Sequence, residues 1–177
     1  MEIEEKEMKK ILITVPLVLI ILFLIYGYIY CNLKSNSVYY AKHTPHKEGT
    51  EPVLMMLVDN LYWVYNPDID GIEYDFDAGK SINHRNPDGK DISWFGTFDG
   101  KRYIYGDKKY ILYEFDKKFK LLYVSKDRNG RVAKKNVDVK EVKKDIYTIL
   151  QPVIDQQTKP FINLQWLFDK VYKDKFN

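Results

Sequence analysis

Residues 11–30, Ile-Leu-Ile-Thr-Val-Pro-Leu-Val-Leu-Ile-Ile-Leu-Phe-Leu-Ile-Tyr-Gly-Tyr-Ile-Tyr, contain no charged side chain. A helix rises about 1.5 Å per residue, so a stretch of this length covers the roughly 30 Å hydrocarbon core of a bilayer. Only a helix satisfies its own backbone there, so β-branched residues do not argue against one. Pro16 lies near the first turn, where a missing N–H costs least, and Tyr26, Tyr28 and Tyr30 crowd the other end as interfacial aromatics do. The sequence predicts a transmembrane helix over 11–30.

This helix is predicted to be retained as an anchor rather than removed. Its apolar run is longer than that of a cleavable signal, and no small-residue cleavage site follows it. The bulky Tyr30 directly before Cys31 does not fit a lipidation site. Cys31 is the only cysteine of the chain, so an internal disulfide cannot form.

The charges beside the anchor give a weak signal of orientation. Three lysines flank it on each side: Lys6, Lys9 and Lys10 before it, and Lys34, Lys42 and Lys47 after it. By the positive-inside rule this is a tie. Lys9 and Lys10 directly abut the apolar run, which favours a cytoplasmic tail over 1–10 and an extracytoplasmic C-terminal domain at the cell membrane. The opposite orientation is the alternative.

The rest of the chain divides into a polar connection and one domain. Residues 31–50 are interpreted as a tether, and residues 51–177 are long enough for one domain with one core. Aromatic residues make up 15 % of the chain, which is typical of a globular rather than a disordered protein. An acidic run over 68–77 and a basic segment over 117–144 can steer a partner or favour an anionic surface. A solvated surface is the simpler explanation of both.

Residues 53–137 are predicted to form an antiparallel sheet, because apolar residues there follow a period of two. The expected strands, about six in number, are drawn from 53–58, 61–65, 72–77, 92–98, 102–105, 110–115, 119–125 and 131–137. Short turns such as Asp99-Gly100 join them, so consecutive strands are antiparallel neighbours in a meander.

The period changes to that of a helix after the sheet. A helix over about 139–155 is expected, with Asp138 and Glu141 as a capping pair, and Pro152 should kink or end it. Its apolar face would hold Val139, Val142, Ile146, Ile149, Leu150 and Val153. A second helix over about 164–174 would begin at Asn163 and bury Leu164, Leu167, Phe168 and Val171. The predicted fold is α+β: a transmembrane helix, an antiparallel β-meander and two C-terminal helices packed on one face.

Two short helices cover only part of one face of such a sheet, yet several strands are apolar on both faces. We therefore expect aromatic surface that contacts a partner, since Tyr and Trp anchor protein interfaces. The alternative is a sheet that curls, or first strands that fold over it. The predicted partner-binding residues are Glu73, Asp75, Asp77, Phe95, Tyr103, Tyr105 and Tyr110.

No constellation typical of an enzyme occurs in the sequence, so we expect neither catalysis nor a small-molecule substrate. Nucleotide, metalloprotease and nucleophile-elbow motifs are missing, and no cofactor or nucleic-acid partner is expected. His43 and His46 have helical metal-site spacing, but a proline lies between them. A weak calcium alternative would use the oxygens of Asn66, Asp68, Asp70 and Asp77 in an EF-hand-like spacing. An acidic β-turn explains that loop more simply.

In this order of elements the chain resembles the TipC-type immunity proteins of Gram-positive bacteria. The likeness covers 38–177 plus the anchor, and it rests on three stretches: Ile-Ser-Trp-Phe-Gly-Thr-Phe-Asp-Gly (92–100), Lys-Tyr-Ile-Leu-Tyr-Glu-Phe-Asp (109–116) and Ile-Asn-Leu-Gln-Trp-Leu-Phe (162–168). The resemblance implies a domain displayed outside the membrane that binds and neutralises an antibacterial toxin exported by a type VII secretion system. The family's target toxin attacks the lipid-linked cell-wall precursor. The alternative is an envelope sensor or accessory protein that binds cell-wall polymer or anionic lipid through the basic segment.

Overall fold

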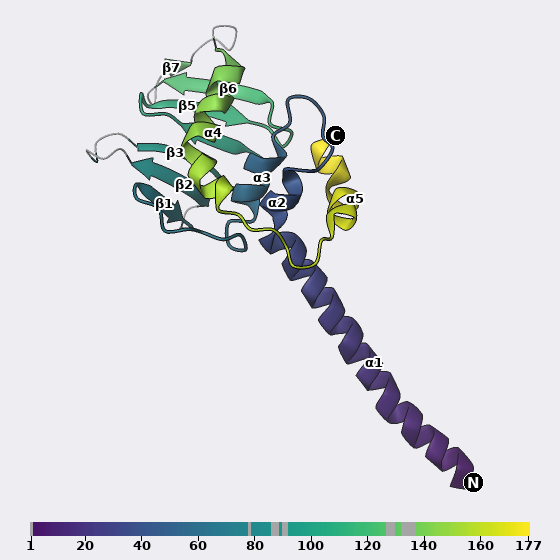
Figure 1. Cartoon of the computed structure of the whole chain (residues 1–177). Coiled ribbons are helices and arrows are strands. Elements are labelled where there is room, and N and C mark those ends of the chain that lie inside the picture. Colours follow the sequence, from purple (N-terminus) through teal and green to yellow (C-terminus); the bar gives the residue numbers. More distant parts are fainter. Residues whose placement is uncertain (1, 78, 86–88, 90–91, 127–129, 132–136) are drawn as a thin grey trace.

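The computed structural model describes residues 2–77, 79–85, 89, 92–126, 130–131 and 137–177. An apolar N-terminal helix leads into an antiparallel sheet followed by C-terminal helices, so the α+β prediction is confirmed (Figure 1). The elements are α1 (Glu2–Ser35), α2 (Ser37–Ala41), α3 (Pro52–Asp59), β1 (Ile72–Asp75), β2 (Lys80–Arg85), β3 (Ile92–Thr97), β4 (Tyr103–Gly106), β5 (Ile111–Phe115), β6 (Leu121–Lys126), β7 (Gly130–Arg131), α4 (Val139–Asp155) and α5 (Gln165–Phe176).

Helix α1 has two parts with different surroundings. Its segment Leu12–Ser35 is long and apolar enough to cross a membrane by length and composition. The apolar side chains from Leu12 to Tyr26 are exposed, and Figure 1 shows this part projecting away from the domain. From Ile29 onward α1 packs against the domain core, and Asn32 and Leu33 are buried. The same helix therefore leaves the domain as an apolar rod without an intervening loop.

The sheet has seven strands in the order of the sequence, β1 to β7, and every neighbouring pair is antiparallel. Because side chains alternate across a sheet, the register sorts them into two faces. One face carries the buried row Ile82, Phe95 and Tyr105, which are directly opposite one another on β2, β3 and β4. We name it the inner face, and the opposite one the outer face.

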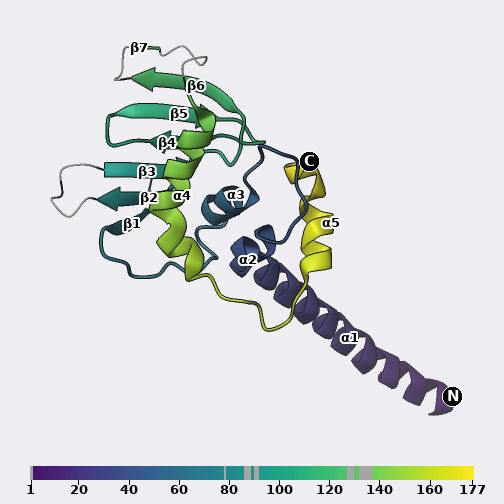
Figure 2. The ribbon, with the colours of Figure 1, turned by 45° about the horizontal axis from the view of Figure 1, so that its top comes forward.

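Helices α3 and α4 lie against the inner face (Figures 1 and 2). Helix α3 is apolar all round, and Leu54, Met55 and Leu57 are completely buried between the sheet and the other helices. Helix α4 buries one stripe, as its amphipathic period predicts: Val142, Ile146, Leu150 and Val153. Asp138 caps it by accepting hydrogen bonds from the N–H groups of Lys140 and Glu141, 2.9 and 3.3 Å long, and the helix continues past Pro152 to Asp155.

Helix α5 packs beside α2 rather than across the sheet. The Phe168 ring lies 5.2 Å from the ring of Tyr40, and Phe176, about two helical turns further on, is also buried. The N-cap residue of α5 is Leu164 rather than the expected Asn163, whose side chain accepts a hydrogen bond from the N–H of Gln165 one position before the cap. Val171, expected on the buried stripe, is exposed.

Two regions were predicted wrongly. The run 53–58 is the helix α3, not a strand, and 61–65 is turn and loop, so the sheet begins at Ile72. A six-residue apolar run has no period, and Pro52 suits the first turn of a helix. The expected tether over 31–50 is also wrong in its first half, because α1 continues through Ser35 and α2 is buried against the core.

Two further differences concern the sheet. β2 was not expected, because its polar sequence hides a single buried residue, Ile82. Of the strand expected over 131–137, residues 132–136 lie outside the described residues.

Candidate binding surfaces

The outer face of the sheet is the first candidate surface. Among the described residues, no helix covers it, whereas α3 and α4 occupy the other side (Figure 2). The register places Trp94 of β3, Gly106 of β4 and Leu112 of β5 in one row, and Gly96, Ile104 and Glu114 in the next. Side chains of the Trp94 and Ile104 rows are half-buried or exposed. This face therefore presents apolar and aromatic groups without a covering layer.

Trp94 lies flat across this face because its neighbour has no side chain. A Cβ added to Gly106 would fall 2.2 Å from Nε1 of Trp94, far inside contact distance, so the indole occupies the space that a side chain would need. The Phe98 ring meets the Trp94 ring edge-on at 6.2 Å. Both residues line a hollow of about 270 Å³ whose floor includes Gly96. The glycines thus hold an aromatic pair beside a shallow depression.

Ion pairs frame this aromatic area. On the β1–β2 side, Arg85 donates two hydrogen bonds to the Glu73 carboxylate, at 2.8 and 3.1 Å. These bonds lower the pKa of the Glu73 carboxyl group below its usual value. On the β4–β5 side, Arg102 donates to Glu114 at 3.1 Å. Both pairs are exposed, so they act as a polar rim rather than as a source of stability.

The structure divides the predicted partner-binding residues. Glu73 and Asp75 lie on the outer face at its β1 edge, in register with Asn83 and Ser81. Phe95, Tyr103 and Tyr105 belong instead to the inner face and are buried, so their prediction as contact residues is wrong.

The last two predicted residues lie outside the strands. Tyr110 is exposed in the β4–β5 turn with a positive φ of 60°. Asp77 is exposed after β1, where its N–H donates to Asp75.

Sequence reasoning missed Trp94, Ile104 and Leu112 because β3, β4 and β5 carry large apolar residues on both alternations. In β3, Trp94 and Phe95 are adjacent, and the alternation alone cannot tell which one is buried. The positions of the glycines indicate which of these two rings lies on the outer face. Gly96 and Gly106 share the alternation of Trp94, and a side without Cβ atoms is the side onto which a large ring can lie flat.

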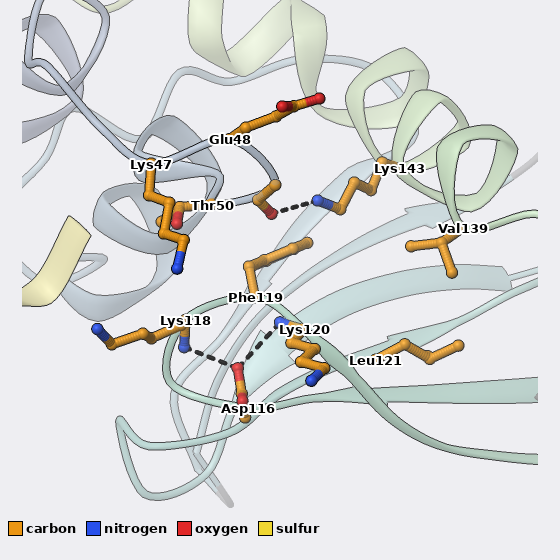
Figure 3. Close-up of a pocket in the computed structure, with 11 residues that line it drawn as sticks. Lys47, Glu48, Thr50, Asp116, Lys118, Phe119, Lys120, Leu121, Val139 and Lys143 are labelled. Atoms are coloured by element: carbon orange, nitrogen blue, oxygen red, sulfur yellow. Dashed lines mark hydrogen bonds between the residues drawn. The ribbon is translucent and has the colours of Figure 1, made fainter. Parts of the chain in front are cut away.

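A second candidate is a cleft of about 520 Å³ between the loop 47–50, the β5–β6 turn and the start of α4. Figure 3 shows Phe119 at its centre, pointing toward Lys143. The Lys143 ammonium lies 5.4 Å from the centre of the Phe119 ring and 2.8 Å from the Glu51 carboxylate. Four lysines line the cleft together with an apolar floor: Lys47, Lys118, Lys120 and Lys143 above Phe119, Leu121 and Val139.

The β5–β6 turn that forms one wall of this cleft is braced by Asp116. Its carboxylate accepts hydrogen bonds from the N–H groups of Lys118 and Lys120 at 2.8 and 2.9 Å, as Figure 3 shows. Phe119 follows in this turn with a φ of 63°, and its ring is buried against the rings of Phe115 and Tyr103, 4.6 and 5.5 Å away. The Lys118 ammonium donates to the carbonyl of Asn177. The side chains of Lys47 and Lys120 remain exposed, so the cleft suits an anionic group attached to an apolar one.

Among the described residues, no group of three or more His, Cys, Asp or Glu side chains is placed to hold a metal. The calcium alternative, which would use the side-chain oxygens of this loop, therefore gains no support. The Asn66 amide nitrogen Nδ2 donates to the carbonyl of Leu61 at 3.0 Å. His43 and His46 each place Nδ1 2.9 Å from a backbone carbonyl.

Comparison of the chain with family models, with curated proteins and with solved structures finds no match.

Proposed function

We propose that this chain is a membrane-anchored immunity protein that binds and neutralises an antibacterial toxin through the outer face of its sheet. In this proposal α1 spans the cell membrane, the domain is extracytoplasmic, and inhibition requires contact but no catalysis. The sequence resemblance supplies the class of partner: a toxin exported by type VII secretion that attacks the lipid-linked cell-wall precursor.

The observation that carries the proposal is the uncovered outer face with Trp94 at its centre. An interface of this kind needs a few aromatic anchors surrounded by polar groups. Trp94, Phe98 and Ile104 are such anchors, and the Glu73–Arg85 and Arg102–Glu114 pairs form such a rim. Rim charges also steer a partner and select its orientation. A toxin that is bound there would be held beside the membrane at which it acts.

Replacing Trp94 tests the proposed contact. The neighbouring genes are searched for a secreted-toxin candidate, and the affinity of that candidate for the full chain in nanodiscs is measured by calorimetry. Trp94→Ala should weaken binding about 30-fold or more, since a central anchor contributes roughly 2 kcal/mol or more. Tyr110→Ala removes a more exposed aromatic ring, which lies in the β4–β5 turn outside the strands of this face, and should leave affinity unchanged. Equal affinity of the Trp94→Ala and parent proteins refutes the proposed contact.

The orientation of the domain has its own test. Protease added to intact cells should digest the domain if it is extracytoplasmic, while a cytoplasmic marker protein survives. Digestion only after lysis would place the domain inside and remove the proposed site of action.

The lysine-lined cleft favours a second candidate function, binding of an anionic cell-wall polymer or lipid headgroup. Lys47 and Lys120 are exposed at this cleft, beside the half-buried side chain of Leu121. Binding to wall polymer or anionic vesicles should then fall with salt and in Lys47→Glu and Lys120→Glu variants. Retention of toxin binding by the same variants would separate this function from the first. Of the basic segment, Lys134 and Lys135 lie outside the described residues.

A further inference from the structure

The end of the domain from which α1 emerges carries exposed apolar side chains. Phe161 is 100 % exposed, and Ile162, Trp63 and Trp166 are 46 %, 43 % and 67 % exposed. We call these four residues the collar. Figures 1 and 2 both show the connection between α4 and α5, and the first turn of α5, on the side where α1 leaves the domain.

Contacts with α1 determine at which residues of that helix the collar lies. The Asn32 side chain of α1 donates to the carbonyl of Ile162 at 3.1 Å, and the Tyr40 hydroxyl lies 3.2 Å from the same carbonyl. Trp63 is fixed independently, because its ring meets the Tyr30 ring edge-on at 5.6 Å. Two contacts from different parts of the chain thus bring collar residues level with residues 30–32 of α1.

That height coincides with the end of the apolar stretch. If residues 11–30 fill the hydrocarbon core, Asn32 lies only about 3 Å beyond it along the helix axis, at about 1.5 Å per residue. The headgroup layer on each side of the core is roughly 5–8 Å thick. The backbone of Ile162 therefore lies within that layer, and the adjoining Phe161 has no protein neighbour that shields it. A flexible tether would allow the domain to move away, but α1 is continuous through Ser35.

We propose that the collar inserts into the headgroup region of the bilayer that α1 spans, and gives the domain a second membrane contact. The inference rests on the proposed function only in requiring that α1 spans a membrane. Tryptophan and phenylalanine favour this layer, since their rings are apolar while the surroundings are partly hydrated. Lys159 is exposed beside Pro160 and Phe161, where its ammonium can reach lipid phosphates. The contact holds the domain at a fixed tilt on the membrane.

The test uses the full chain with Cys31→Ala, reconstituted in nanodiscs of phosphatidylcholine and phosphatidylglycerol. Nanodiscs expose both membrane sides, so orientation does not affect access. A single cysteine, from Phe161→Cys, Trp166→Cys or the control Lys126→Cys, carries an environment-sensitive NBD label. Lys126 is exposed in β6, which Figures 1 and 2 show at the end of the sheet away from α1.

Labels at 161 and 166 should show blue-shifted emission, quenching by doxyl lipids and protection from iodide, whereas a label at 126 should show the reverse. If the label at 161 behaves like that at 126 in protein that co-migrates with the discs, the collar proposal is overturned while the anchor stands. If the protein does not co-migrate with the discs, both the anchor and the collar are refuted. The outer-face contact is tested separately by toxin affinity: Trp94→Ala should weaken it, whereas Phe161→Cys, which alters only the collar, should not.

Discussion

Tyr40 joins α1 to the rest of the domain, and replacing its hydroxyl group tests how firmly the two are connected. The ring is completely buried. Its hydroxyl lies 2.6 Å from Asn32 Oδ1, to which it donates, and accepts a hydrogen bond from the N–H of Leu164 at 3.0 Å. Burial raises the pKa of this hydroxyl, so it remains a donor at neutral pH. Tyr40→Phe removes both bonds and leaves the ring in place.

The expected cost follows from these two contacts. An average hydrogen bond contributes about 1 kcal/mol, and a buried polar group left without a partner costs about 1–3 kcal/mol more. The Leu164 N–H and the side-chain Oδ1 of Asn32 would both lose a partner in Tyr40→Phe. We therefore expect a loss of roughly 2–4 kcal/mol in the free energy of unfolding. Tyr39→Phe is the matched control, since Tyr39 is the next residue and only half-buried; its change should stay within about 0.5 kcal/mol.

Urea unfolding of the full chain in nanodiscs, followed by near-ultraviolet circular dichroism, measures the difference between these two variants. Hydrogen exchange provides a local measurement, because the Leu164 amide should exchange faster in Tyr40→Phe while the amides of β3 and β4 keep their protection. Equal stability of Tyr40→Phe and Tyr39→Phe, with unchanged exchange at Leu164, would refute a hydrogen-bonded joint between α1 and the α4–α5 connection.

Three further predictions concern stability. Asp59→Ala should destabilise the domain by about 3 kcal/mol in urea unfolding, because it removes the carboxylate that accepts from Tyr103 and pairs with partly buried Lys175. The Tyr103→Phe background lacks the Tyr103 hydrogen bond. If Lys175→Ala costs as much stability as Asp59→Ala in that background, the ion pair with Lys175 is the dominant contribution of Asp59. Tyr110→Asn should stabilise by up to about 1 kcal/mol in thermal unfolding, since asparagine tolerates the positive φ of this exposed turn; a lower melting temperature contradicts this. Burial raises the pKa of Tyr105 to about 12 and also raises that of Tyr103. The free energy of unfolding therefore contains the full contribution of these buried tyrosines below a pH of about 10, the pKa of an unfolded tyrosine. Above that pH, each tyrosine that ionises only in the unfolded state lowers the free energy of unfolding by about 1.4 kcal/mol per pH unit. Phenolate absorbance that rises fully before unfolding would contradict this.

The parts of the fold that were predictable are those in which local chemistry and tertiary packing agree. Helix α4 has a single apolar stripe and an aspartate cap, and both appear in the structure as the sequence indicates. The hairpin between β3 and β4 follows from Asp99-Gly100, where Gly100 has a φ of 66°. Helix α3 was mistaken for a strand because it is buried on all sides, and burial of this kind removes the helical period from the sequence.

The candidate surfaces were less predictable because they depend on contacts between distant residues. The sequence places Trp94 and Phe95 side by side but contains no local rule that assigns one to the core, so the partner-binding prediction chose the buried residue. The collar could not be predicted at all. It exists because Asn32 and Ile162, separated by 130 residues, are hydrogen-bonded, and a segment interpreted as a tether gave no reason to place them together.

The difference between a tether and a continuous helix changes how the proposed inhibitor would act. A flexible tether of about twenty residues would let the domain move over roughly 25 Å. Because α1 is continuous into the core, the outer face of a domain anchored by α1 would instead keep one height and one tilt above the membrane. Such a domain cannot search for a toxin, so it depends on toxin that arrives at the membrane in a matching orientation. It loses less conformational freedom on binding, which favours affinity. Inserting a glycine–serine linker after Ser35 would therefore weaken protection of cells against the toxin, although toxin binding in solution would persist. Full protection by the linker variant would show that a fixed position of the domain is unnecessary.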